Sequence, residues 1–205
     1  MIKAIFFDMG GVLLPLHIEP CIEAYHNVAG FKDIENYINP WHQKGLFKEL
    51  ERGMVNLDDF AVECLKHCYP GTTVQTLLDC HSKFFDPPKK ETVDTVHEFA
   101  AKYDVFVLSN INEIAITILT PIFEEAGLPF ESSFKKLFFS YRMHMLKPDP
   151  EIYLEAIAQS GYKPEEILFI DDSQLNVDAG NAAGIKSVLY VPGTSLRDLI
   201  EFNLK

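Results

Sequence analysis

Three short apolar segments of the chain each end in polar residues that could take part in chemistry. The junctions are residues 2–7 before Asp8, residues 104–108 before Ser109-Asn110, and residues 166–170 before Asp171-Asp172. Each segment is rich in β-branched or aromatic residues, as buried strands are. In a parallel α/β sheet, ligands bind beyond the carboxyl ends of the strands. We therefore expect these polar residues to converge in space although they lie far apart in the sequence.

These residue types suit the hydrolysis of a phosphate ester, which needs a nucleophile, charge neutralisation and hydrogen-bond donors. The Asp8 carboxylate can attack phosphorus, but a cation must then lie between the two negative partners. Asp171 and Asp172 could hold Mg²⁺ together with Asp8, because oxygen ligands suit this ion. Ser109 and Asn110 can donate hydrogen bonds to the phosphate oxygens.

A glycine pair and a lysine extend this set of phosphate-binding groups. Gly10 and Gly11 follow Asp8 closely and permit a tight turn whose backbone N–H groups point at an anion, so Gly11 is predicted to bind phosphate. Lys147, just before Pro148, supplies a point charge for the same phosphate. Taken singly, such residues are commonly turns or helix caps. Their joint occurrence at successive strand ends favours a site.

Strands alternate with helical patterns from about residue 90 onward, which predicts βαβ units and a parallel sheet. Two further strands are expected at Leu137–Phe139 and Ser187–Val191. The expected helices are Glu91–Tyr103, Glu113–Glu125, Glu151–Ser160 and Leu175–Ala183. The predicted fold class is α/β, with a Rossmann-like parallel five-stranded sheet and helices on both faces.

Residues 15–88 differ, because they carry aromatic and acidic helical patterns and no convincing strand. Asn56 or Asp58 is expected to cap a helix, and Pro87-Pro88 resembles a linker. We therefore expect a discontinuous α/β core of residues 1–14 and 89–205, with an inserted α-helical cap domain of residues 15–88. The aromatic residues of this insert are predicted to form its core: Trp41, Phe47, Phe60, Tyr69, Phe84 and Phe85.

Four motifs of the chain together resemble those of the haloacid dehalogenase superfamily. They are Asp8-Met9-Gly10-Gly11-Val12, Leu108-Ser109-Asn110, Lys147-Pro148-Asp149-Pro150 and Phe169-Ile170-Asp171-Asp172-Ser173. Their order and approximate spacing match, and the resemblance spans nearly the whole chain. The insert resembles the small helical cap that one large subgroup carries after the first motif. The sequence is also similar to sugar-phosphate phosphatases and to the N-terminal domains of epoxide hydrolases.

The resemblance implies a role for each matching residue. Asp8 would be the catalytic nucleophile that forms an aspartyl-phosphate, and Lys147 would act with it. Ser109 and Lys147 would hold the phosphate, with Asn110 nearby.

The same resemblance implies a metal site. Asp8, the carbonyl of Gly10 and Asp172 would bind Mg²⁺, and Asp171 would act through a water molecule on the metal.

One departure from the family pattern concerns general acid–base catalysis. Related phosphatases usually carry a second aspartate two residues after the nucleophile, where this chain has Gly10. General acid–base help is worth a factor of about 10²–10⁴. Three explanations are open: the leaving group needs no acid, a residue of the cap replaces the missing aspartate, or the protein is a weak or inactive enzyme. His17 is one replacement acid, and a surface loop histidine is the other interpretation of that residue.

The predicted function is therefore a Mg²⁺-dependent phosphatase acting on a small phosphorylated metabolite, with a sugar-1-phosphate as one candidate. One alternative is a phosphate-binding or regulatory protein that has lost turnover, as Gly10 would allow. The other is a 2-haloacid dehalogenase, a reaction that needs no metal ion and leaves the Asp171-Asp172 pair and Lys147 unexplained.

Composition limits the partners of this protein. Its 205 residues carry a formal net charge of −12 and a pI of about 4.9, which disfavours nucleic-acid binding without a local basic patch. No segment has the roughly 20 apolar residues of a membrane helix, and the N-terminal apolar run is too short for a signal peptide. Four cysteines fit reduced thiols, so a cytoplasmic location is expected. The oligomeric state can be a monomer or a dimer.

Overall fold

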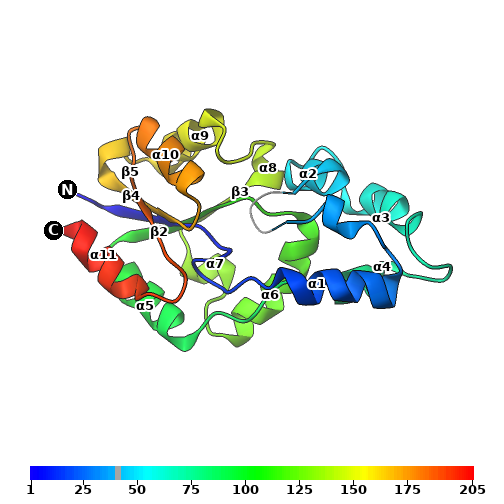
Figure 1. Ribbon diagram of the computed structural model, residues 1–205. Coiled ribbons are helices and arrows are strands. Elements are labelled where there is room, and N and C mark those ends of the chain that lie inside the picture. Colours follow the sequence, from blue (N-terminus) through cyan, green and yellow to red (C-terminus); the bar gives the residue numbers. More distant parts are fainter. Residues whose placement is uncertain (40–42) are drawn as a thin grey trace.

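A five-stranded, all-parallel sheet forms the centre of the protein, as the computed structural model of residues 1–39 and 43–205 shows. The strand order is β3-β2-β1-β4-β5 (Figure 1). The strands are β1 (Ala4–Phe7), β2 (Asp104–Ser109), β3 (Lys136–Phe139), β4 (Ile167–Asp171) and β5 (Lys186–Leu189). The predicted α/β class and the five-stranded parallel sheet are thus confirmed.

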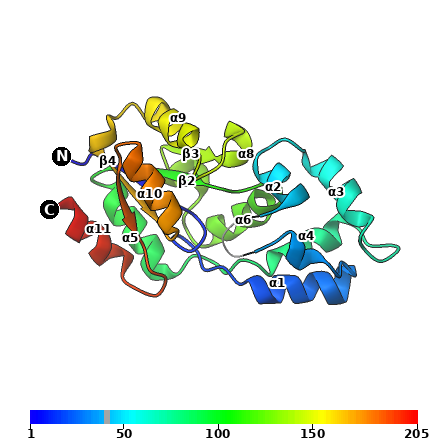
Figure 2. The ribbon, with the colours of Figure 1, turned by 45° about the horizontal axis from the view of Figure 1, so that its top comes forward.

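Helices cover both faces of the sheet (Figures 1 and 2). One face carries α5 (Lys90–Ala100), α6 (Glu113–Glu125) and α11 (Leu196–Leu204), and the other carries α9 (Pro150–Ser160) and α10 (Gln174–Ala182). The alternation of side chains along each strand explains this arrangement. In β1, Ile5 and Phe7 pack with the α5 and α6 side chains, whereas Phe6 packs with those of α9. Both faces are apolar because the sheet is buried on both sides.

Three helices of the core lie outside the predicted set. The helices α7 (Phe130–Ser133) and α8 (Ser140–Met143) have a single turn each, which is too short for a periodic pattern. The longer α11 has a recognisable start, because the Ser195 hydroxyl accepts a hydrogen bond from the Asp198 N–H at 3.2 Å. A serine at this position is a common helix cap, so this helix could have been predicted from the sequence.

The insert between β1 and α5 is built from helices. They are α1 (Ile18–Ala24) with a π-helical continuation (Tyr25–Ala29), a 3-10 turn (Ile34–Asn36), α2 (Gly45–Glu51), α3 (Leu57–Leu65) and α4 (Val74–Ser82). Asn56 is the residue that caps α3, since its Oδ1 accepts from the Asp59 N–H at 2.8 Å. These helices share a hydrophobic cluster of their own, to which the core contributes Ile114 of α6. We call α1–α4 the helical insert.

The two chain segments that connect the helical insert to the sheet run side by side. The His17 N–H donates to the Phe84 carbonyl at 2.8 Å, and the Asp86 N–H donates to the Pro15 carbonyl at 3.2 Å. The His17 ring is exposed and lies 2.8 Å from the Asp86 carboxylate. This contact lies on the surface of the connection, in agreement with the surface interpretation of His17.

The aromatic residues of the helical insert do not all belong to its core. Phe47 and Phe60 are fully buried with ring centroids 4.7 Å apart. The prediction that Tyr69 belongs to this core was wrong, because half of its surface is exposed. Tyr69 follows the end of α3, and its ring lies so close to Gly30 that a side chain there would collide with it. Trp41 lies outside the described residues.

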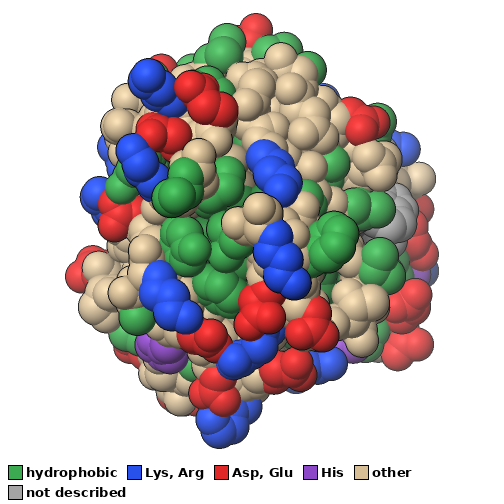
Figure 3. Space-filling model, turned by 90° about the vertical axis from the view of Figure 1, so that its left-hand side faces the viewer, with side chains coloured by type: hydrophobic (Ala, Val, Ile, Leu, Met, Phe, Trp, Pro, Cys, Tyr) green, Lys and Arg blue, Asp and Glu red, His purple; other side chains and the backbone are tan. Residues whose placement is uncertain are grey.

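The face that carries both termini has charged side chains of both signs (Figure 3). Figure 3 shows Lys and Arg side chains on that face interspersed with Asp and Glu around a hydrophobic centre. Within residues 1–39 and 43–205, no helix has both the length and the apolar character that spanning a bilayer requires.

Candidate active site

The strand register brings the predicted polar residues to one edge of the sheet. Phe7 pairs with Val107 on one side and with Ile170 on the other, so the next residues lie beyond the same edge. The Asp8 N–H continues this pairing by donating to the Ile170 carbonyl at 2.8 Å. The strand ends therefore place Asp8 beside Asp171, as predicted from the sequence.

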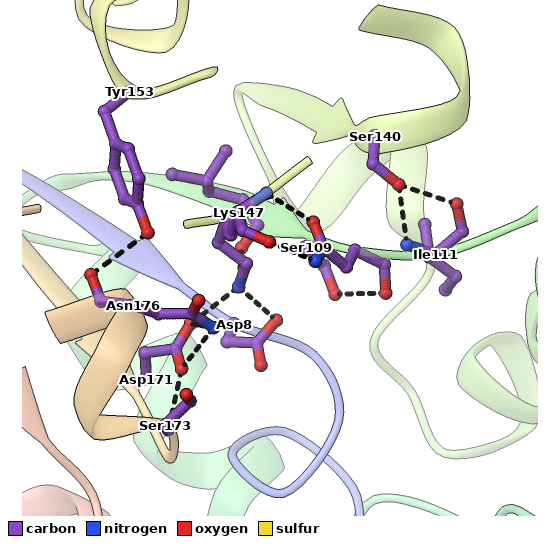
Figure 4. A network of polar contacts seen from close by, with 11 residues as sticks. Asp8, Ser109, Ile111, Ser140, Lys147, Tyr153, Asp171, Ser173 and Asn176 are labelled. Atoms are coloured by element: carbon purple, nitrogen blue, oxygen red, sulfur yellow. Dashed lines mark hydrogen bonds and ion pairs between the residues drawn. The ribbon is translucent and has the colours of Figure 1, made fainter. Parts of the chain in front are cut away.

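Lys147 lies at the centre of this group (Figure 4). Its Nζ is 2.9 Å from Asp8 Oδ1 and 2.6 Å from Asp171 Oδ2, and it donates to the Leu108 carbonyl at 2.9 Å. The side chain is 1% exposed. Burial lowers the pKa of this ammonium, but Asp171 and Asp8 more than offset the effect and hold the pKa above its ordinary value. Lys147 is therefore a fixed positive charge inside a carboxylate cluster.

Asn110 fixes the backbone of Lys147. Its Nδ2 donates to the Lys147 carbonyl and its Oδ1 accepts from the Lys147 N–H, both at 2.8 Å. This paired contact joins the end of β2 to the loop before α9. The amide is thus engaged in positioning Lys147, and its predicted contact with phosphate stays a prediction.

Asp171 is held by partners that the sequence did not single out (Figure 4). Its Oδ1 accepts from the Ser173 N–H at 2.8 Å, and both of its oxygens lie within 3.1 Å of Asn176 Nδ2. Asn176 is fixed in turn, because its carbonyl accepts from the Tyr153 hydroxyl at 3.0 Å. With Lys147 also bound, Asp171 is fully hydrogen-bonded, which suits an indirect role at a metal better than a direct one.

Three carboxylates form a group that could hold a metal ion. Asp8, Asp171 and Asp172 each offer an oxygen, and these atoms lie within 4.8 Å of one another. Asp8 Oδ1 is buried and, among the described residues, accepts no aligned hydrogen bond. Burial, and then repulsion from Asp8 and Asp171, raise the pKa of Asp172 to about 7. A hard divalent cation would supply the missing positive charge, so these residues fit one.

Gly11 makes room for the third carboxylate. A Cβ at this position would lie 2.0 Å from Asp172 Oδ2, and the backbone φ of +74° is one that other residues rarely adopt. The Gly11 N–H donates to the Leu14 carbonyl at 2.9 Å and closes the turn. The structure thus gives Gly11 a role in placing Asp172, and phosphate binding by its N–H stays a prediction.

A cavity above the strand ends joins the sheet to the helical insert. The sheet side contributes Asp8, Gly10, Ser109, Asn110, Lys147 and Asp172 to its lining. The insert and its connections contribute Leu14, Leu16, Gln43, Glu51, His81, Phe84 and Phe85. His17 is not part of this lining. The predicted site residues other than Gly11 and Asp171 therefore face one cavity, and the insert covers it.

Two titratable groups of this lining come from the helical insert and were missed in the sequence. Burial and the nearby Asp8 raise the pKa of Glu51, at the end of α2, to about 8. Burial lowers the pKa of His81 to about 4, and its Nδ1 lies 3.4 Å from the Tyr25 hydroxyl. Both shifts favour the neutral form of the side chain. No motif could have identified them, because only the folded insert brings them to the site.

Ser140 joins the helical insert to the core. Its Oγ accepts from the Ile111 N–H at 2.9 Å (Figure 4). The same hydroxyl donates to the Glu51 carbonyl at 2.7 Å, and the residue is fully buried. We expect Ser140→Ala to lower the free energy of unfolding by about 1–3 kcal/mol, because it leaves two buried backbone groups unsatisfied. Urea denaturation measures this loss, with the exposed Ser132→Ala as control. Equal stability of the two variants would contradict this account of Ser140.

Comparison with known proteins places this geometry among related sequences. A family model for haloacid dehalogenase-like hydrolases matches residues 2–184. The chain is 30% identical to a D-ribitol-5-phosphate phosphatase of Bacteroides thetaiotaomicron, over 91% of each protein. It is 28% identical to a phosphorylated carbohydrates phosphatase of Thermotoga maritima, over 92% of this chain and 85% of that protein.

A solved structure agrees closely with the whole fold. It is a haloacid dehalogenase family enzyme from Bacteroides thetaiotaomicron, crystallised as a variant with magnesium and inorganic phosphate. The TM-score is 0.92 at 28% identity, and the match covers 98% of this chain and 99% of that one.

Proposed function

Because the chain belongs to the haloacid dehalogenase-like hydrolases, we propose that it is a Mg²⁺-dependent phosphatase that hydrolyses small phosphorylated metabolites through an aspartyl-phosphate on Asp8. The observation that carries the proposal is the buried Asp8 carboxylate, which lies against Lys147 within a three-carboxylate cluster and faces a cavity. Relatives that act on phosphorylated carbohydrates support the substrate class.

The residues around Asp8 divide the work of phosphoryl transfer. Asp8 attacks phosphorus, and Ser109 donates a hydrogen bond to a phosphate oxygen from the end of β2. Lys147 has three N–H groups, and all three face Asp8, Asp171 and the Leu108 carbonyl. A bound phosphate therefore replaces Asp8 as one of the partners of Lys147, which frees the nucleophile at the moment of attack.

Mg²⁺ would be held by Asp8 and Asp172, with the Gly10 carbonyl as a third ligand and Asp171 acting through water. When bound, it screens the repulsion between the carboxylate and the phosphate. Support comes from the oxygen-only donor set of the three carboxylates and from the magnesium complex of the related enzyme.

Residues 15–88, which comprise the helical insert and its two connections, would act as a cap over the site. Its residues line the cavity, and closure would exclude water from the aspartyl-phosphate. Gln43 Oε1 is buried and has no hydrogen-bond partner in the described part of the chain, so it suits a substrate hydroxyl. The hydroxyls of a sugar or polyol phosphate would supply such a donor to Gln43, and a sugar-1-phosphate is one of the candidate substrates.

The unpaired cysteines accord with a reducing, cytoplasmic setting.

Phosphate release tests the proposed function directly. The purified protein is incubated with Mg²⁺ and a panel of sugar-1-phosphates, terminal sugar and polyol phosphates, acyl phosphates and pyrophosphate. We expect turnover of at least one class, abolished by chelation and restored by added Mg²⁺. Halide release from 2-haloacids that survives chelation would instead identify a dehalogenase. Tight phosphate binding with no turnover across the panel would identify a binding protein.

The carboxylate cluster should make the stability of the metal-free protein depend on pH. Burial above all raises the pKa of Asp8 to about 6 and that of Asp172 to about 7. A carboxyl whose pKa is raised by folding stabilises the protein below its ordinary pKa, and this contribution is lost as pH rises through the folded value. Because the ordinary pKa of an aspartate is about 4, we expect these carboxyls to lower Tm in a chelator progressively between about pH 4 and pH 7, and Mg²⁺ to raise Tm more at the upper end.

Thermal scans with and without Mg²⁺ measure this dependence, and Asp172→Asn is the matched variant. It should flatten the fall of Tm in the chelator because it removes one of the two carboxyls. A difference in Tm between Asp172→Asn and the parent that stays constant from about pH 4 to pH 7 in the absence of metal would contradict the assigned directions.

A further inference from the structure

The space beside Gly10 is filled by an apolar side chain. Gly10 has no positive φ, so its backbone does not require glycine. A Cβ built on it would lie 2.8 Å from Cδ1 of Leu16. An acidic side chain on this turn would have to displace Leu16, so the first motif supplies no proton donor to the cavity.

The helical insert brings a different carboxyl to the same cavity. Glu51 is the last residue of α2, and its side chain lines the cavity together with Asp8 and Lys147. The residue is 9% exposed, and its carboxyl makes no hydrogen bond or ion pair with any residue that the structure describes. Leaving a buried carboxyl without a partner is costly, so such a group in a cavity points to a ligand or to catalysis.

The position of Glu51 is fixed from the core side. Its carbonyl accepts the Ser140 hydroxyl, and the neighbouring Arg52 pairs with Asp149 at 3.0 Å, two residues after Lys147. A Cβ on Gly53 would collide with the Tyr141 carbonyl, so the chain passes very close to α8 here. The end of α2 is therefore docked on the loop that carries the phosphate-binding lysine.

We propose that Glu51 donates the proton to the leaving group and so replaces the acid that position 10 lacks; this inference rests on the phosphatase function proposed above. Asp8 attacks phosphorus, the bond to the leaving oxygen breaks, and the Glu51 proton passes to that oxygen to give the alcohol. The Glu51 carboxylate then takes a proton from the water that attacks phosphorus. This second step breaks the bond to Asp8 and releases inorganic phosphate, and both carboxyls return to their starting states.

The two histidines near the site and Asp171 are poorer proton donors. Burial lowers the pKa of His81 to about 4 and so favours its neutral form, and its Nδ1 lies 3.4 Å from the Tyr25 hydroxyl. His17 is exposed, pairs with Asp86 and does not line the cavity. Asp171 is saturated by Lys147, Ser173 and Asn176.

Glu51→Gln tests this role, because it keeps the size of the side chain and removes the acid. Rates are measured with Mg²⁺ on a series of phosphate monoesters, from activated aryl phosphates to simple alkyl phosphates. Proton donation matters most for poor leaving groups, so the variant should lose about 10²–10⁴ in kcat on alkyl phosphates and little on activated aryl phosphates. Glu49→Gln, exposed on the same helix, is the control and should match the parent on both.

The outcomes separate the two proposals. A selective loss on alkyl phosphates supports Glu51 as the proton donor, and retained aryl phosphate activity shows that the variant is folded. An equal loss on all esters would overturn the proposal in favour of a binding or structural role. Unchanged alkyl activity would overturn it as well, with the phosphatase function left intact. A parent protein that releases phosphate from no ester would overturn both.

Discussion

The Asp8→Asn variant is expected to lose at least about 10⁴ in kcat while keeping its fold. The amide has the shape of the carboxylate but cannot attack phosphorus, and it is a poorer ligand for a divalent cation. Asp8 is buried beside Lys147, Asp171 and Asp172. Steady-state phosphate release on the best substrate of the panel measures the loss.

Stability provides the control for this variant. Burial raises the pKa of Asp8 to about 6, so the charge is disfavoured where it lies. Asp8→Asn should therefore be at least as stable as the parent in a chelator above about pH 7. Turnover by the variant within a factor of about ten of the parent would exclude covalent catalysis by Asp8.

Lys147→Met should damage both stability and activity. The ammonium is almost fully buried between Asp8 and Asp171, and its removal leaves two carboxylates facing each other without a cation. Breaking a buried pair in this way costs about 3–5 kcal/mol. For a protein of this size, the cost corresponds to a decrease in Tm of about 6–20 °C. The variant should also bind phosphate weakly, because the fixed positive charge is gone.

Thermal scans in a chelator measure this effect, with Lys32→Met as the matched exposed control. Added Mg²⁺ should recover part of the loss in Lys147→Met, since it supplies positive charge to the same carboxylates. Equal Tm values for the two variants would show that Lys147 is not the electrostatic centre of the site.

The residues at strand ends could be predicted because their placement follows from local rules. Apolar runs that stop at Asp8, Ser109 and Asp171 are strands, and parallel strands bring their carboxyl ends to one edge. The β1 register with β2 and β4 confirms this edge. The starts of α6 and of α9 after Pro148-Asp149-Pro150 were likewise visible in the sequence.

Residues that depend on how the helical insert docks could not be predicted. Glu51 lies in an ordinary amphipathic helix, and Ser140 follows a short strand. Only the tertiary contact between α2 and Ser140 of α8 brings Glu51 to the cavity. The prediction that Tyr69 is buried was wrong for a related reason, since helical spacing says nothing about a residue that lies beyond the end of the helix. His17 is adjacent to the first motif in sequence, yet the connection turns it to the surface.

Acid quenching during turnover is the most direct test of the phosphoryl-enzyme on which this account depends. The protein is mixed with Mg²⁺ and its best substrate, stopped in acid within one turnover, digested and examined by mass spectrometry. The account predicts one added phosphoryl group on the peptide that contains Asp8, labile to hydroxylamine as an acyl phosphate is, and absent from Asp8→Asn. Phosphate release with no phosphorylated peptide, or with the phosphoryl group on another residue such as His81, would contradict it.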